Sequence, residues 1–326
     1  TGQLRGASGT DRTGTPTLKN YPAEKGYLIE AMEEGSVYNL IVDGFDTEEL
    51  TNVNLSMGLV GTASKTAFDH IEMRNVTMPG VPAAAGALAG TLNDSTVSYC
   101  SVTGAEMATT QPQRTTYDLA VGGLLGSLKD TKVNSCYASE VTIDASAGGG
   151  VDGIGGLIGS LAGNGSVTDA YASGSINSSF GSVGGLVGTS ECEIRRAWTS
   201  VDIVSVANNI GGILGTAGKS MNLTSSFAAG EVYSKTGSFD KVGRIYGSGI
   251  GTAKVTTSRS FAYESQMING QTSEEKLDAY GLLSADKLSG SSARVGWSRR
   301  VGIGSGFRLL GKDSPEQTNG LLPYLL

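Results

Sequence analysis

Few side chains in this sequence are of the types that carry out chemistry. There is one histidine, His70, and there are three cysteines, Cys100, Cys136 and Cys192, without a Cys-x-x-Cys spacing. A structural zinc site takes about four Cys or His ligands, and the zinc-protease helix needs two histidines. The single histidine therefore excludes the zinc-protease helix and any His-rich metal site, the scattered spacing of the cysteines argues against a four-ligand zinc site, and the odd number of cysteines excludes a complete disulfide framework. We expect His70 at the surface or at the edge of a repeat, on the same strand face as Phe68.

The carboxylates are grouped away from the middle of the chain. They cluster at 30–34, 43–49 and 274–278, whereas the middle carries scattered ones such as Asp144, Asp169 and Asp202. A glycoside hydrolase lines its cleft with two carboxylates. Asp43 and Asp46 come nearest to such a pair, but solvated charge is the better interpretation. We expect no catalytic residue in this chain.

Two glycine-rich segments resemble ligand-binding loops only superficially. The segment 148–156 is similar to a calcium-binding nonapeptide, but its aspartate, Asp152, stands fifth instead of sixth and no tandem copy follows. The segment 181–185 lacks the following helix that would hold a pyrophosphate. We interpret both as loops and expect no cofactor.

Composition narrows the possible partners. The 326 residues include 49 glycines and 7 prolines, and the formal net charge is −7. An acidic chain lacks the basic stripe that binds nucleic acid and the polybasic patch that binds membrane surfaces. No apolar run approaches the roughly 18 residues of a membrane span, so no membrane insertion is expected. Thr1 in place of methionine, with no signal peptide, suggests a processed product or an excised fragment.

One short phrase recurs along most of the chain. It reads glycine, two apolar residues and glycine, often with a second glycine in front, and its spacing is near 30 residues. The last glycines of the seven copies are Gly61, Gly90, Gly126, Gly159, Gly188, Gly215 and Gly247. A looser phrase follows each later copy and carries an aromatic residue: Tyr99, Tyr137, Tyr171, Trp198, Phe227 and Phe261.

This repeat predicts the fold. Each unit holds two or three short apolar runs with period-2 alternation, separated by Gly, Ser, Asn and Asp, and is too small to bury its own apolar face. Stacking copies about 4.8 Å apart buries that face. We therefore predict an all-β, right-handed parallel β-solenoid of about eight coils. The last glycine of each phrase should turn a corner with φ > 0, which glycine adopts without steric cost.

The apolar pair within each phrase should split between two faces, because a strand alternates sides. The first members should form an inner column: Leu124, Leu157, Leu186 and Ile213. The second members, such as Val187, lie against a loop or are turned inward by a corner twist. A second inner column should comprise Val133, Val167, Ile194 and Leu223.

The recurring aromatic residues and the first two cysteines each allow two interpretations. The recurring aromatics are either an interior stack, which their small neighbours favour, or a track on which sugars stack. Cys100 and Cys136 stand ten residues after Gly90 and Gly126, so they should lie in adjacent coils. They are then either packed thiols, which the parallel side-chain directions suit, or a disulfide.

Three segments follow from these patterns. Residues 1–25 are a polar lead or an irregular first coil, and residues 26–265 form the solenoid. Residues 266–326 form a small C-terminal cap, because an open solenoid end is an edge that templates aggregation. Within the cap, residues 273–289 are the one helix-like stretch.

The phrase resembles the GLUG motif, for example at Gly185-Leu-Val-Gly188, and the resemblance spans about residues 35–265. Gly296-Trp297, Phe307-Arg-Leu-Leu310 and Gly320-Leu-Leu-Pro-Tyr-Leu325 are similar to the endings of such arrays. The motif occurs in bacterial surface and secreted proteins, including streptococcal-type immunoglobulin A metalloproteases and filamentous-haemagglutinin-like adhesins. The resemblance implies a β-solenoid. It assigns no protease residue here, because the zinc-binding motif is absent.

From the resemblance we expect a non-catalytic exported bacterial protein, extracellular or at the cell surface, that serves as an adhesion, recognition or spacer module. Its partners would be a host protein or glycan, or neighbouring domains of a surface protein. Two alternatives stay open. The chain is a substrate-holding region of an immunoglobulin-A-type metalloprotease whose catalytic domain lies elsewhere, or it is a filament subunit that associates end to end.

The scarcity of ligands gives a first test. After dialysis, elemental analysis should find no stoichiometric transition metal, because one histidine and scattered cysteines cannot supply a four-ligand site. Zinc bound at one equivalent would contradict this prediction.

Overall fold

The fold is described from a computed structural model, which describes residues 3–5, 15–50, 55–110, 120–147, 153–207, 209–238, 240–263, 266–271, 281–283, 307–309 and 323–325. The described residues form strands and turns but no helix. None of them therefore makes a helix with the length and hydropathy to cross a bilayer.

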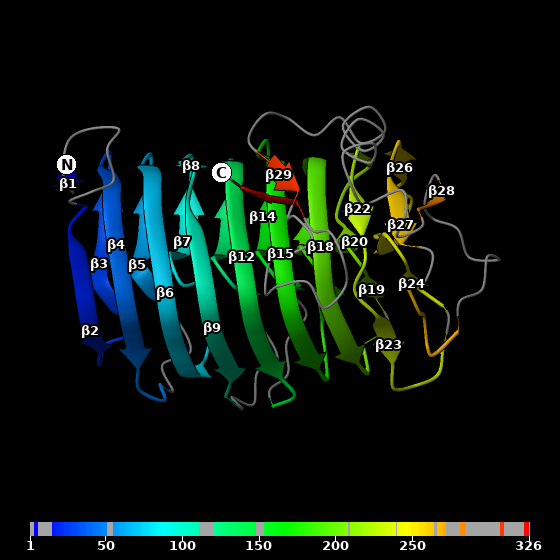
Figure 1. The fold of residues 1–326 in the computed structure, drawn as a ribbon, viewed down its shortest axis with the longest axis horizontal. Coiled ribbons are helices and arrows are strands. Elements are labelled where there is room, and N and C mark those ends of the chain that lie inside the picture. Colours follow the sequence, from blue (N-terminus) through cyan, green and yellow to red (C-terminus); the bar gives the residue numbers. More distant parts are fainter. Residues whose placement is uncertain are drawn as a thin grey trace.

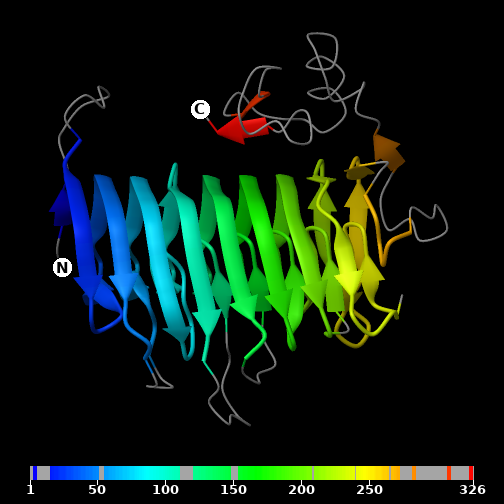
Figure 2. The same cartoon turned by 60° about the horizontal axis from the view of Figure 1, so that its bottom comes forward.

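Three parallel sheets run along the axis of a β-solenoid of about seven turns (Figures 1 and 2). This confirms the predicted fold class, with about seven turns in place of about eight. Most coils repeat the same order: a strand of the long sheet, a strand of the short sheet, a two-residue bend and a strand of the second sheet.

The long sheet has 15 strands and forms one broad side of the molecule. Its members are β1 (Gln3–Arg5), β2 (Thr17–Ala23), β4 (Ser36–Thr47), β6 (Ala67–Val81), β8 (Thr96–Ser98), β9 (Ser101–Thr109), β12 (Lys132–Ala145), β15 (Ser166–Ser178), β18 (Glu193–Ser205), β21 (Met221–Thr224), β22 (Phe227–Ala228), β23 (Val232–Ser234), β26 (Val255–Ser258), β27 (Phe261–Tyr263) and β28 (Gly281–Leu283).

The other two parallel sheets close each coil. The second sheet comprises β3 (Tyr27–Glu33), β5 (Gly58–Ser64), β7 (Ala89–Asn93), β11 (Leu125–Lys129), β14 (Ile158–Ala162), β17 (Val187–Ser190), β20 (Leu214–Ala217) and β25 (Tyr246–Gly249). The short sheet comprises β10 (Val121–Gly122), β13 (Gly153–Gly155), β16 (Ser182–Gly184), β19 (Asn209–Gly211) and β24 (Val242–Gly243). A separate antiparallel pair is formed by β29 (Phe307–Leu309) and β30 (Pro323–Leu325).

The two ends of the solenoid carry strands that extend the long sheet. Strands β1 and β2, within the expected lead, pair with β4 and extend the long sheet. Residues 281–283, expected to be helical, instead form β28 beside β27, whose open edge offers backbone hydrogen-bond partners. The rest of the helix-like stretch 273–289 lies outside the described residues, as does most of the expected cap.

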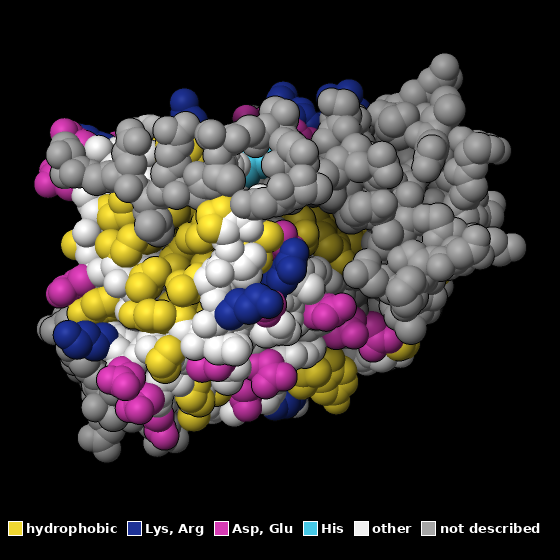
Figure 3. Space-filling view, turned by 60° about the vertical axis from the view of Figure 1, so that its left-hand side comes forward, with side chains coloured by type: hydrophobic (Ala, Val, Ile, Leu, Met, Phe, Trp, Pro, Cys, Tyr) yellow, Lys and Arg dark blue, Asp and Glu magenta, His cyan; other side chains and the backbone are white. Residues whose placement is uncertain are grey.

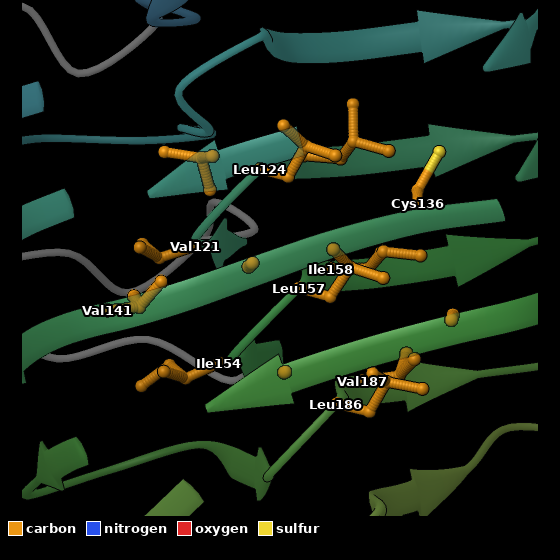
Figure 4. Close-up of a cluster of buried hydrophobic side chains, with 14 of the residues drawn as sticks. Val121, Leu124, Cys136, Val141, Ile154, Leu157, Ile158, Leu186 and Val187 are labelled. Carbon is orange, nitrogen blue, oxygen red and sulfur yellow. The ribbon is translucent and has the colours of Figure 1, made fainter. Parts of the chain in front are cut away.

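The predicted inner columns are present. Leu124, Leu157, Leu186 and Ile213 are each 0% exposed, and their backbones are hydrogen-bonded from coil to coil at 2.8–3.1 Å. Figure 4 shows successive leucines of this column pointing the same way. The second column, from Val133 to Leu223, is in register and at most 1% exposed.

The expected split of the apolar pair between two faces is wrong, and the alternative, a second member turned inward at the corner, is confirmed. The second members are Leu125, Ile158, Val187 and Leu214, and each is also 0% exposed. The reason is that each first member lies in the bend and each second member opens the next strand. Alternation along one strand does not extend across this bend, so both residues reach the core (Figure 4).

The predicted positive φ at the phrase glycines is also wrong. Gly126, Gly159, Gly188 and Gly215 lie outside the left-handed region. They are instead positions of close backbone approach. A Cβ on Gly126 would stand 2.8 Å from the amide nitrogen of Ala85, and one on Gly215 would stand 2.6 Å from that of Val183.

The approach recurs in each coil. A Cβ on Gly159 would lie 2.5 Å from the nitrogen of Val121, one on Gly247 would lie 2.6 Å from that of Ile210, and one on Gly188 would overlap that of Ile154. The glycines of β14, β17, β20 and β25 therefore each face the backbone of the short-sheet strand one coil earlier, and we call this close contact the seam. The seam leaves no space for a side chain.

Large positive φ values occur in another column. In the turns from β4 to β27 a left-handed residue recurs at one register of the long sheet, and β6 and β12 each contain a second one further along, Asn75 and Glu140. The kink residues at the shared register are Asn39, His70, Tyr99, Ser135, Asp169, Arg196, Ser225 and Arg259, with φ of 50° to 54°. Such conformations are uncommon outside glycine, and their stacking shows that a kink recurs in every turn.

The last regular turn is filled differently. Arg244 takes the place of the second glycine of the phrase, is 0% exposed and donates to the carbonyl of Gln266. The Nε2 of Gln266 in turn donates to the carbonyl of Gly230 at 2.8 Å. The C-terminal part of the core is therefore filled by buried polar side chains that are hydrogen-bonded to backbone carbonyls.

Leu186→Ala tests the inner column. The substitution should lower the free energy of unfolding by about 2–5 kcal/mol, since it removes apolar contacts and leaves a cavity. Val204 lies on the long sheet and is 37% exposed, so Val204→Ala should change the free energy of unfolding by no more than about 0.5 kcal/mol. Urea unfolding of both variants measures the difference, and equal stabilities would contradict the register.

Gly188→Ala separates close approach from backbone conformation. We expect a loss near the top of the roughly 1–3 kcal/mol that overpacking costs, because backbone atoms cannot move aside as a side chain can. Gly237 is the matched control: its φ is 68° and nothing lies within 4 Å of its added Cβ. Gly237→Ala should cost about 1–2 kcal/mol from conformation alone. Calorimetric melts in which Gly188→Ala is the milder change would refute the seam.

Candidate ligand-binding face

The outer face of the long sheet carries the aromatic column. Tyr171 lies between Ala170 and Ala172, which both belong to the core, so its ring points away from the core. Strand pairing aligns Tyr137, Tyr171, Trp198, Phe227 and Phe261 in one row. The interpretation as an interior stack is therefore wrong, because small neighbours on these strands mark the inward positions.

The rings of this row stack on one another. The centroids of Tyr171 and Trp198 are 4.7 Å apart with 28° between planes, and those of Trp198 and Phe227 are 6.3 Å apart with 12°. Their faces are thus directed along the solenoid axis, toward each other. Ring edges, not faces, are directed outward. A track of aromatic faces for sugars is not what this geometry provides.

Tyr99 does not belong to the row. Tyr137 pairs with Ser101, and Tyr99 is one of the kink residues, 47% exposed. Its ring stacks on that of His70 with centroids 4.8 Å apart. His70 Nδ1 lies 2.7 Å from Asp69 Oδ2, and both side chains are partly exposed. The single histidine is a surface residue paired with an adjacent carboxylate.

The kink also changes which residues share a face. Alternation predicted Phe68 and His70 on one face and Ile71 on the other, but Phe68 and Ile71 are both buried. A left-handed residue between them reverses the alternation. The eight kink residues belong to six types, Asn, His, Tyr, Ser, Asp and Arg, so no residue type in the sequence marks the kink.

Carboxylates on this face connect neighbouring coils. Asp169 and Arg196 form an ion pair between successive kinks, with Nε 2.7 Å from Oδ1, and this pairing raises the pKa of Arg196. Asp144 accepts from the amide of Ser146 and from Asn177 Nδ2, and hydrogen bonding, chiefly to Ser146, lowers its pKa.

Two further carboxylates also accept hydrogen bonds from a neighbouring coil. Asp43 accepts from Asn75 Nδ2 at 2.7 Å, and Asp202 accepts from the amide of Glu231 at 2.8 Å. Asp46, the other half of the candidate catalytic pair, is exposed. These carboxylates are held in hydrogen bonds that join coils, and no pair of them is arranged around a cleft in the described part of the chain.

At the turns, Glu191 joins three coils. It accepts from Lys219 Nζ at 2.7 Å and from the amide of Gly163 at 3.0 Å. The contact with Lys219, followed by the amide of Gly163, lowers the pKa of Glu191. This carboxylate is another link between turns.

The cysteines are buried free thiols. Cys100 and Cys136 donate to the carbonyls of Ser98 and Asn134, two residues earlier, at 3.2 and 3.3 Å. Burial, followed by the neighbouring Cys136 thiol, raises the pKa of Cys100 well above its ordinary value. The structure therefore contains the packed-thiol alternative and not the disulfide.

Metal ligands do not gather in the described residues: no three His, Cys, Asp or Glu side chains there come close enough to hold an ion. The glycine-rich loop that resembles a calcium site falls mostly outside the described residues, at 148–152.

Comparisons with known proteins support the architecture. No known family matches the sequence, so the resemblance to the GLUG motif is unconfirmed, and no curated protein sequence matches either. A solved structure from Bacteroides ovatus, titled a "putative immunoglobulin A1 protease", superposes with a TM-score of 0.57 at 17% identity. The match covers 89% of this chain and 86% of that one. At this identity the likeness establishes a shared fold.

Proposed function

We propose that this chain is a non-catalytic recognition or spacer module of an exported bacterial protein, extracellular or at the cell surface, that binds a host protein or glycan. The observation that carries the proposal is the outer face of the long sheet. It is a continuous, rigid surface whose carboxylates are held in hydrogen bonds between coils, and it also presents exposed apolar side chains. A surface of this kind suits binding better than catalysis.

Two parts of that face are suited to contact. Tyr99, with His70 stacked on it, is 47% exposed near one edge of the face. Tyr233, also 47% exposed, pairs in register with Val204 on the neighbouring strand. Exposed aromatic side chains supply much of the binding energy in protein interfaces.

The full chain should be screened against an array of glycans and host proteins that includes immunoglobulin A. We expect a ligand whose binding is weakened at least tenfold by Tyr99→Ser combined with Tyr233→Ser. Ile250→Ser, at a 63% exposed apolar residue in a turn, should leave binding unchanged. A ligand that is cleaved during the assay, or one that ignores the tyrosine substitutions, would contradict the proposal.

The substrate-holding alternative has one specific observation in its favour, the shared fold with the Bacteroides ovatus structure. Under this alternative the chain would bind immunoglobulin A and present it to a catalytic domain. Selective binding of immunoglobulin A without cleavage on the same array would favour this form of the proposal.

The filament alternative is favoured by the N-terminal end of the solenoid. There, partly buried apolar residues lie against the core, among them Leu18, Tyr21, Leu28, Ile29 and Met32. Hydrophobic side chains gather over this end in Figure 3. Concentration-dependent fibres in electron micrographs of the purified chain would favour end-to-end association.

A further inference from the structure

The aromatic ladder, defined as Tyr171, Trp198 and Phe227, faces outward and is nevertheless covered. Its residues are 6%, 1% and 1% exposed. On the same outer face, Tyr99 and Tyr233 are 47% exposed. A side chain on the outside of a single sheet is removed from water only by chain packed against that outside.

Strand β30 is at the right place to provide this cover. It lies against β12 and β15, the strands that carry Tyr137 and Tyr171. In Figure 1 the β29–β30 pair overlaps the upper ends of the middle strands of the long sheet. In Figure 2, turned by 60°, the pair stands off the same strands. Residues near the C-terminus therefore return about 150 positions along the chain to the centre of the solenoid.

The strand pair is not another turn of the solenoid. β29 and β30 are antiparallel and form a two-stranded sheet of their own, without ladder hydrogen bonds to the three parallel sheets among the described strands. A two-stranded hairpin is marginally stable alone in water. It needs an apolar surface to pack on, and the ladder is one.

The chemistry of the ladder suits such an occupant. Most of its ring surface is apolar and packs against apolar side chains, while Tyr171 adds a hydroxyl and Trp198 an N–H. The indole Nε1 of Trp198 is buried without a hydrogen-bond partner within the described part of the chain.

We propose that the aromatic ladder is a docking surface for the C-terminal strand pair of the same chain, and that β29–β30 is a strap closed over it. The strap covers the middle of the face that we propose for recognition, but the inference stands independently of that function. Release of the strap would expose a row of three stacked aromatic residues.

Trp198 reports directly on the strap, because the chain has two tryptophans and Trp297→Phe leaves one. In that background, Pro323, Tyr324 and Leu325 are all replaced by serine. We expect the emission of Trp198 to shift to the red and its acrylamide quenching to rise several-fold, while the circular-dichroism melt of the solenoid keeps its midpoint. The matched control replaces Val204 and Tyr233, which are exposed on the same sheet, and Val206, exposed just after β18, by serine and should change neither signal.

The reciprocal experiment guards against a variant that fails to fold. Trp198→Ala should accelerate amide hydrogen exchange in residues 307–309 and 323–325, whereas Val204→Ala should not. Unchanged Trp198 quenching and unchanged exchange would overturn the proposal. So would sedimentation showing that the wild-type chain is a dimer whose dilution to monomer exposes Trp198, since a second copy would then be the cover.

Discussion

The fold depends on one steric constraint, a seam between adjacent coils where there is no room for a side chain. Within one coil the short-sheet and second-sheet strands are joined by only two residues, and the glycine of the second-sheet strand faces a backbone nitrogen of the preceding coil's short-sheet strand, as Gly215 faces Val183. Close passage turns the chain sharply enough to direct both members of the apolar pair into the core. The column of Leu124, Leu157 and Leu186 exists because the seam places each leucine in the bend.

The regular backbone pairing of all three parallel sheets runs along the axis, from one coil to the next. Backbone pairing, the buried columns, the ion pair of Asp169 with Arg196 and the links made by Glu191 all join one turn to the next. In a repeat protein, stability is approximately a sum of terms for each turn and for each interface between turns. The same links hold the carboxylates in place, which leaves the outer face rigid and its polar groups already satisfied.

Sequence periodicity predicted the parallel solenoid and the leucine column because both depend on spacing alone. Periodicity did not predict the backbone conformation of individual residues, which depends on local geometry. Gly188 was assigned to a corner since glycine often has φ > 0, yet space and not conformation requires it. The true left-handed positions, such as Arg196 and Ser225, have no common residue type. Those kinks reverse the strand alternation, which is why Tyr171 and Trp198 were expected inside and lie outside. The cover over them could not be foreseen, because it joins segments far apart in the chain.

The backbone dihedral angles of Gly188 and Arg196, measured together by NMR, test the central claim that space and not conformation selects the repeat glycines. The account predicts φ near +51° at Arg196 and a value outside the left-handed region at Gly188. A left-handed Gly188 beside an extended Arg196 would contradict it, because the glycines would then turn corners and the seam would not exist.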